Sequence, residues 1–188
     1  MLKVALVGNI ASGKSAVEAI LKKNGYSVLD TDKVCHNLLA ELPQVAEEFG
    51  EYDVFEDGKL SREKLGTLVF NNPTLRKKLE NILYPSLRVK INEFFETSEG
   101  IAFVAIPLLF EAEMTDLFDK ILFIYTNDKI RLERLIKRNN YTKEYAKLRM
   151  AAQMSQDEKV KKSDVVIYNN STLEALEQNV KISIEQIR

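Results

Sequence analysis

Five short apolar runs punctuate the chain. Each has the length of a β-strand and is apolar throughout, which is the pattern of strands buried on both faces. The runs are Leu2 to Val7, Tyr26 to Leu29, Ile101 to Ile106, Ile121 to Tyr125 and Val165 to Tyr168. Helical patterns lie between most of them. The alternation predicts an α/β fold with a parallel five-stranded sheet, helices on both faces, and ligands beyond the carboxyl ends of the strands.

Two connections between these runs are longer than a simple crossover. The connection over about 31–99 has helical periodicity, and we interpret it as an inserted helical lobe for a substrate. The connection over about 128–162 is charged and helical, with a break at 139–142, and we interpret it as a lid. A single domain over 1–188 would then have a core of residues 1–30, 100–127 and 163–188.

Local signals mark where helices begin or end. Gly25 is placed to end the first helix, and Pro73 to begin another. Ser171 and Glu174 have the spacing of a capping box at the start of the last helix. These signals agree with helices between the apolar runs.

Composition excludes several classes of protein. The 27 Lys and Arg against 28 Asp and Glu give a net charge of -1, so nothing global indicates a nucleic acid or an anionic membrane as partner. The longest apolar run, Ile101 to Phe110, is shorter than a membrane span, and no signal peptide is evident. Cys35 and His36 are the only cysteine and histidine, which excludes a disulfide framework and a Cys/His zinc cluster. We expect a cytoplasmic monomer.

Residues 8–15 match the phosphate-binding pattern G-x-x-x-x-G-K-[ST], between a strand and an amphipathic run. Its glycines permit a turn that directs backbone N–H groups at anionic oxygens. Lys14, which we expect to be exposed, would reach the β- and γ-phosphates, and the Ser15 hydroxyl would bind Mg²⁺. A glycine turn with an exposed lysine is the alternative, but the strand-loop-helix context favours the phosphate site. The ATP-binding residues would be Gly8, Asn9, Ile10, Ala11, Ser12, Gly13, Lys14, Ser15 and Ala16.

Two carboxylates, Asp30 and Asp32, follow the second apolar run. Residues two apart in an extended segment share a face, so both could face the terminal phosphate. Phosphoryl transfer to an alcohol needs a carboxylate that takes the proton of the hydroxyl, and Asp32 is our candidate. The alternative is that one carboxylate caps the next helix and the other is solvated. His36 lies four residues after Asp32, where a polar surface residue is the simpler interpretation.

Arg131, Arg134 and Arg138 recur at steps of three and four residues and so share a helical face. A solvated charged face is one interpretation. The other is a lid that delivers an arginine to the transferring phosphoryl group and excludes water. Arg138, beside the break at 139–142, is best placed for that role.

Several separate blocks of the chain resemble the dephospho-coenzyme A kinase family in order and spacing. The blocks are residues 8–15, 30–36, 57–65, 69–73, 106–111, 134–138, 151–155 and 164–170. The resemblance implies a P-loop kinase fold that transfers the γ-phosphoryl group of ATP to the ribose 3′-hydroxyl of dephospho-coenzyme A, the last step of coenzyme A synthesis. It also implies ATP and dephospho-coenzyme A as small-molecule substrates and Mg²⁺ as the cofactor.

The resemblance implies roles for individual residues. Lys14, Asp32 and Arg138 would be catalytic, with Asp32 as base or orienter of the acceptor hydroxyl and Arg138 as the lid arginine. Asn169 and Asn170 would lie near the adenine of ATP. The acceptor-binding residues would be Asp32, His36, Arg62, Leu108 and Glu111.

Some residues depart from the usual pattern of that family. They are Asn9, Ala11 and Ala16 around the phosphate-binding loop, and Tyr84, where a histidine is common. We expect Asn9 to be tolerated because asparagine can adopt a positive φ.

Two other functions stay open. One is a different P-loop kinase of small molecules, such as a nucleoside monophosphate kinase. The other is a nucleotide-dependent switch without productive transfer, although a switch would need neither Asp32 nor Arg138.

Overall fold

The computed structural model describes residues 1–188. It contains two compact units, one made of residues 1–30 and 94–188 and the other of residues 31–93. None of its helices combines the length and the apolarity that a membrane crossing needs.

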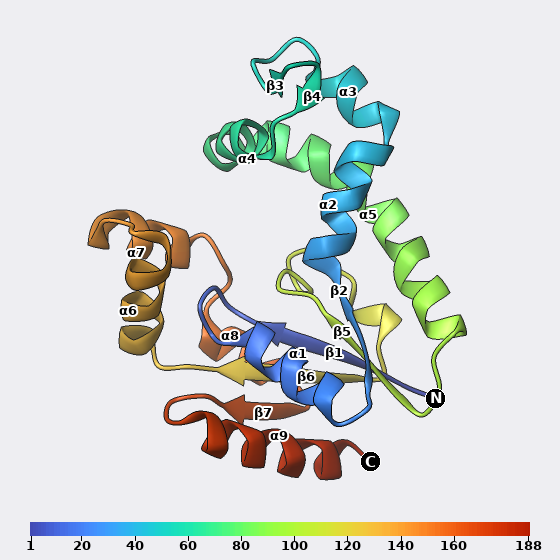
Figure 1. Ribbon diagram of the computed structural model, residues 1–188, viewed down its shortest axis with the longest axis vertical. Helices are drawn as coiled ribbons and strands as arrows, with labels where there is room; N and C mark the ends of the chain where they lie inside the picture. Colours follow the sequence, from blue (N-terminus) through green and yellow to red (C-terminus); the bar gives the residue numbers. More distant parts are fainter. The chain divides into compact units, whose positions relative to one another are not determined.

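The first unit is built on a parallel five-stranded sheet in the order β2-β5-β1-β6-β7 (Figure 1). Its strands are β1 (Leu2–Gly8), β2 (Ser27–Asp30), β5 (Ile101–Ala105), β6 (Lys120–Tyr125) and β7 (Val165–Tyr168). The central strand β1 pairs with β5 and β6, so that Val4 lies beside Phe103 on one side and Lys120 on the other. The predicted sheet is therefore confirmed, with strand ends shifted by one residue at most.

Helices α1 (Lys14–Lys23) and α9 (Leu173–Ile187) pack together and cover one face of this sheet (Figure 1). Leu6 of β1 and Val17 of α1 belong to the core beneath them. Val7 points to the opposite face and is also fully buried, so both faces of β1 are covered. Burial of each such side chain stabilises the fold by about 1.5–3 kcal/mol, which makes the sheet a rigid support for the loops at its carboxyl edge.

Three helices lie between β6 and β7 in the chain. They are α6 (Asp128–Asn139), α7 (Lys143–Ala151) and α8 (Gln156–Lys161), and a short 3₁₀ helix (Thr115–Leu117) precedes β6. Asn140 ends α6 in a left-handed conformation with φ of 53°, and Thr142 caps α7 by accepting the N–H of Tyr145. The predicted break between two helices is therefore confirmed.

One predicted helix end and one predicted helix start are confirmed, and a second predicted start is wrong. Gly25, with φ of 83°, follows the end of α1, and Pro73 is the first residue of α5. The start of α9 lies one position later than the predicted capping box. Thr172 is its cap, because the Thr172 hydroxyl accepts the N–H of Ala175, and Ser171 lies outside the helix.

The second unit consists of four helices and a small hairpin. Its elements are α2 (Thr31–Glu41), α3 (Pro43–Phe49), β3 (Phe55–Glu56), β4 (Lys59–Leu60), α4 (Arg62–Asn71) and α5 (Pro73–Glu96), whose last residues belong to the first unit. Asp57 and Gly58 turn the hairpin, with φ of 48° and 73°. The sequence analysis missed this hairpin, although an Asp-Gly pair is typical of such turns.

Candidate functional site

The phosphate-binding loop joins β1 to α1 at the carboxyl edge of the sheet (Figure 1). Ala11 and Gly13 have left-handed backbones, with φ of 62° and 93°. A Cβ on Gly13 would lie 2.1 Å from Nδ2 of Asn169, and a Cβ on Gly8 would lie 2.4 Å from Oγ of Ser12. Left-handed residues in such a loop turn successive N–H groups to one side, which suits an anion. Both glycines of the motif are therefore required by geometry.

The left-handed conformation falls on Ala11 and not on Asn9. An alanine in that region costs roughly 1–2 kcal/mol, so the loop is strained at Ala11. Asn9 contributes through its side chain, which is 3% exposed and donates from Nδ2 to the carbonyl oxygen of Met154 at 2.9 Å. The expectation that Asn9 is tolerated through a positive φ is wrong, because its side chain provides a contact instead.

Lys14 is the first residue of α1, and its side chain is only 13% exposed. Its Nζ lies 3.1 Å from Oε1 of Glu18, whose side chain is 8% exposed. The expected exposure of Lys14 is therefore wrong, because α1 supplies a carboxylate one turn later. Ser15 is exposed in the first turn, which leaves its hydroxyl open to a metal ion. Sequence reasoning missed Glu18, and its spacing of four residues from Lys14 was the available signal.

The ends of β6 and β7 hold the loop in place. The carbonyl oxygen of Ser12 accepts hydrogen bonds from Oγ1 of Thr126 and Nδ2 of Asn169, each at 2.8 Å. Both donors are buried. Asn170 is exposed, and its Oδ1 accepts the N–H of Asn127 at the start of α6. The structure thus places Asn169 against the phosphate-binding loop and Asn170 beside the cap of α6.

Arg131 ties α6 to the same loop. Its side chain is 3% exposed, and its Nε donates to the carbonyl oxygen of Ile10 at 3.0 Å. Its Nη1 lies 2.7 Å from Oδ1 of Asp128. Burial lowers the pKa of Arg131, and the charge of Asp128 opposes that shift. Arg131 therefore positions the loop, a role that its place on the shared helical face did not reveal.

The other two arginines of α6 differ in their surroundings. Arg134 is half-buried, with Nη2 3.5 Å from the carbonyl oxygen of Asn169. Arg138 is exposed at the end of α6, where its Nε donates to Oδ1 of Asn139. Sequence reasoning chose Arg138 for catalysis, whereas the α6 arginines beside the loop are Arg131, which binds Ile10, and Arg134, which lies near Asn169. Arg134 lies four residues before Arg138 and so shares its helical face, which was the available signal for Arg134 in the sequence.

Glu111 and Leu108 follow β5. Leu108 is 38% exposed. Oε1 of Glu111 accepts the N–H of Met154 at 3.1 Å and lies 2.9 Å from Nζ of Lys159, which is completely buried in α8. Lys159 also donates to the carbonyl oxygen of Pro107 at 3.1 Å. Burial lowers the pKa of Lys159, and the hydrogen bond that its ammonium donates to Glu111 opposes the shift. Glu111 therefore anchors the segment that leads into α8.

Three predicted acceptor residues lie in the second unit. Asp32 is exposed in the first turn of α2, and His36 is exposed one turn later. Arg62, at the start of α4, donates from Nη1 to Nδ1 of His36. His36 and Arg62 both line a pocket of about 640 Å³. Burial, followed by the charge of Asp32, raises the pKa of the Cys35 thiol to about 11, so this thiol is protonated at neutral pH.

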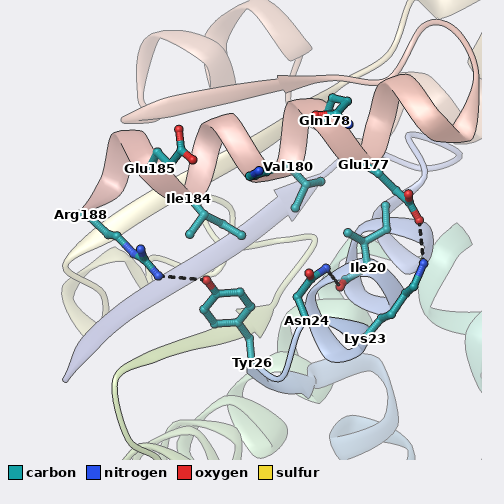
Figure 2. A pocket seen from close by; sticks show the side chains of 11 residues that line it. Ile20, Lys23, Asn24, Tyr26, Glu177, Gln178, Val180, Ile184, Glu185 and Arg188 are labelled. Carbon is teal, nitrogen blue, oxygen red and sulfur yellow. Dashed lines mark hydrogen bonds and ion pairs between the residues drawn. The ribbon is translucent and has the colours of Figure 1, made fainter.

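Another pocket, of about 420 Å³, lies between α1 and α9 (Figure 2). Two of the charged groups that line it form an ion pair, and a third binds a tyrosine hydroxyl. Lys23 pairs with Glu177 at 3.3 Å, and Arg188 donates to the hydroxyl of Tyr26 at 3.3 Å. Lys23 and Lys14 are at opposite ends of α1, so this pocket is separate from the phosphate-binding loop.

The sequence of the chain matches the family model described as dephospho-CoA kinase over residues 2–175. A dephospho-CoA kinase of Listeria innocua is 38% identical over 191 aligned positions, which cover 97% of this chain and 96% of that protein. A dephospho-CoA kinase of Enterococcus faecalis is also 38% identical, with coverage of 99% and 98%.

Solved structures that resemble this chain also include a dephospho-CoA kinase. The dephospho-CoA kinase of Campylobacter jejuni has a TM-score of 0.70 at 31% identity, covering 98% of this chain and 96% of that one. A Thermus thermophilus protein has a TM-score of 0.88 at 32% identity, with coverage of 100% and 98%. A shikimate kinase of Aquifex aeolicus has a TM-score of 0.55 at 17% identity, with coverage of 98% and 96%, which shows a common fold.

Proposed function

The chain belongs to the dephospho-CoA kinase family, and from that premise we propose which of its residues carry out the reaction. The enzyme transfers the γ-phosphoryl group of ATP to the ribose 3′-hydroxyl of dephospho-CoA and thereby forms coenzyme A. In our proposal it acts in the cytoplasm as a monomer.

The observation that carries the proposal is the phosphate-binding loop at residues 8–15. Its left-handed residues suit a tetrahedral anion, and the start of α1 adds the positive end of a helix dipole. Lys14 would turn from Glu18 to the β- and γ-phosphates when ATP binds. Nucleotide binding therefore replaces one ion pair of Lys14 with another.

Mg²⁺ would enter with ATP. The ion prefers six oxygen ligands, keeps several waters, and takes few ligands from protein when phosphate oxygens are available. The exposed hydroxyl of Ser15, beside Lys14 at the start of α1, fits that need for one protein oxygen. When bound, the ion would neutralise charge that develops on the phosphoryl oxygens.

The acceptor would bind through the second unit. Asp32 follows the end of β2 by two positions, and β2 ends at the same edge of the sheet as β1. Its exposed carboxylate would orient the 3′-hydroxyl and take its proton as the phosphoryl group is transferred. His36 and Arg62, which are hydrogen-bonded to each other, would contact the acceptor at the neighbouring pocket.

Two arginines of α6 would act on the phosphates. Arg134 lies beside the loop and would bind ATP before transfer. Arg138 stands at the end of α6 next to the left-handed Asn140, where a change of backbone angle would move its guanidinium. A guanidinium in that position would stabilise the charge that spreads over the phosphoryl oxygens in the transition state.

Release of ADP across a panel of acceptors tests the proposal. We expect rapid release with dephospho-CoA, and little release with AMP, with shikimate or without acceptor. Lys14→Ala should abolish release, whereas Lys23→Ala, at the other end of α1, should not. Equal rates with AMP would assign the enzyme to another acceptor, and binding of ATP without any release would indicate a switch.

A further inference from the structure

Two hydrogen bonds join the phosphate-binding loop to the connection between α7 and α8. Oε1 of Gln153 accepts the N–H of Ile10 at 2.8 Å. Nδ2 of Asn9 donates to the carbonyl oxygen of Met154 at 2.9 Å. Gln153 and Ile10 are 143 positions apart in the chain. The loop and the connection are therefore joined by two hydrogen bonds of ordinary length, one donated from each loop residue.

Ile10 is bound on both of its backbone polar groups. Oε1 of Gln153 accepts the N–H of Ile10, and Nε of Arg131 donates to the carbonyl oxygen of Ile10 at 3.0 Å. Both side chains come from the segment between β6 and β7. These two bonds fix the peptide planes on either side of Ile10, and the second of these planes leads into the strained, left-handed Ala11.

The connection that carries Gln153 is itself anchored. The N–H of Met154 donates to Oε1 of Glu111, which pairs with the fully buried Lys159 of α8. On its other side, the connection leads directly from α7, which ends at Ala151. Gln153 therefore stands between a fixed point of the core and a helix of the proposed lid.

We propose that Gln153 is a positioning residue that links the shape of the phosphate-binding loop to the position of α7. Nucleotide bound to the preformed loop would restrict its remaining motion and, through Ile10 and Gln153, would also hold α7 in place. Without this link α7 would stay mobile while ATP is bound, and water would reach the γ-phosphate. The inference rests on the proposed function, because it concerns the same site.

Gln153→Met and Gln153→Glu separate the hydrogen bond from the packing. Methionine keeps the length of the side chain and loses the acceptor oxygen, whereas glutamate keeps an oxygen that Ile10 can bind. We expect Gln153→Met to raise the KM for ATP about tenfold, as expected for an unpaired N–H in a half-buried site. It should also raise, several-fold, the ADP released without phosphorylation of the acceptor. Gln153→Glu should restore the ratio of transfer to hydrolysis.

Hydrogen exchange with Mg²⁺ and a non-hydrolysable ATP analogue provides a readout without turnover. In the unaltered enzyme, we expect the analogue to protect amides of residues 9–16 and 143–151 together. In Gln153→Met, protection should remain at residues 9–16 and disappear at 143–151. Joint protection of both segments in Gln153→Met would overturn the proposal. Failure to use dephospho-CoA would count against the proposed function alone, because exchange needs no acceptor.

Two further variants complete the test. Gln178→Ala changes an exposed glutamine of α9 (Figure 2) and should leave the KM and the exchange pattern unchanged. If Gln153→Met proves unfolded in a thermal melt, Asn9→Ala removes the parallel bond to Met154 and leaves Gln153 in place. It should weaken protection of 143–151 in the same direction, and an unchanged pattern would contradict the link.

Discussion

Lys14 and Glu18 form an ion pair across one turn of α1, with Nζ and Oε1 3.1 Å apart and both side chains largely buried. A buried ammonium without a counter-ion would be costly, and Glu18 supplies one before any nucleotide arrives. The phosphates of ATP therefore compete with a carboxylate for the same ammonium. The affinity for ATP depends on both anions.

Glu18→Gln should tighten binding of ATP. The amide keeps the volume of the side chain and removes the charge that competes for Lys14. Removal of this competing carboxylate should strengthen ATP binding by about 1 kcal/mol. This free energy corresponds to a roughly fivefold lower Kd for ATP. Titration calorimetry with Mg²⁺ and an ATP analogue measures it. Glu133→Gln, an exposed carboxylate of α6, controls for net charge, and an equal gain in that variant would contradict the competition.

Asp32→Asn should slow transfer and leave ATP binding unchanged. Asparagine preserves the size of this exposed side chain and cannot take a proton. Loss of a general base typically lowers kcat about 10²–10⁴-fold. Steady-state kinetics and analogue titration separate the two quantities. Equal weakening of ATP binding would instead make Asp32 part of the metal site, and Asp53→Asn serves as a control in the same unit.

Arg138→Ala and Arg134→Ala should differ in kind. We expect Arg138→Ala to lower kcat and kcat/KM by similar factors, because its charge would act in the transition state. These factors would correspond to a loss of roughly 3–5 kcal/mol of transition-state stabilisation. Arg138→Lys should recover part of the loss, since an ammonium lacks the planar fork. Arg134→Ala should mainly raise the KM for ATP, because its guanidinium already lies beside the loop. A raised KM with normal kcat in Arg138→Ala would reverse the two assignments.

Glu111→Gln should lower stability in a manner that depends on pH. It leaves the fully buried Lys159 without its carboxylate, which costs about 3–5 kcal/mol at neutral pH. Burial lowers the pKa of Lys159 below its ordinary value of 10.5. Between the lowered pKa and 10.5 the unfolded chain binds more protons than the folded chain, so stability from this group rises with pH. The deficit should therefore shrink in alkaline solution.

Urea unfolding of Glu111→Gln at neutral and alkaline pH measures that deficit. The double variant Glu111→Gln with Lys159→Met removes both charges and should recover most of the stability at both pH values. A deficit that grows with pH would show that Lys159 is not the cause.

Much of the fold could be predicted because its signals are local. A central parallel strand such as Leu2–Gly8 is buried on both faces, so it must be apolar throughout. The phosphate-binding loop has a fixed length and needs glycine at Gly8 and Gly13, and the contacts of both residues explain why. Asn140 could be predicted as a break because asparagine tolerates the left-handed conformation that ends α6.

The remainder depends on tertiary contacts that spacing along the chain does not encode. Gln153 and Thr126 each bind the loop from more than 100 positions away. The capping prediction for α9 failed since Ser171 and Thr172 are both competent caps, and only the path of the chain after β7 selects Thr172. Glu18 lies four residues after Lys14, a spacing that is visible in the sequence, whereas the burial of this pair depends on the fold around α1.

Ala11 holds a left-handed backbone, with φ of 62°, that alanine rarely adopts in an unfolded chain. Its neighbours keep it there, because Ile10 and Ser12 are both hydrogen-bonded to other parts of the first unit. The backbone is thus bent for an anion when the protein folds, and not when the nucleotide arrives. Association of ATP should then proceed in one bimolecular step, at a rate proportional to its concentration, without a slow rearrangement of the loop.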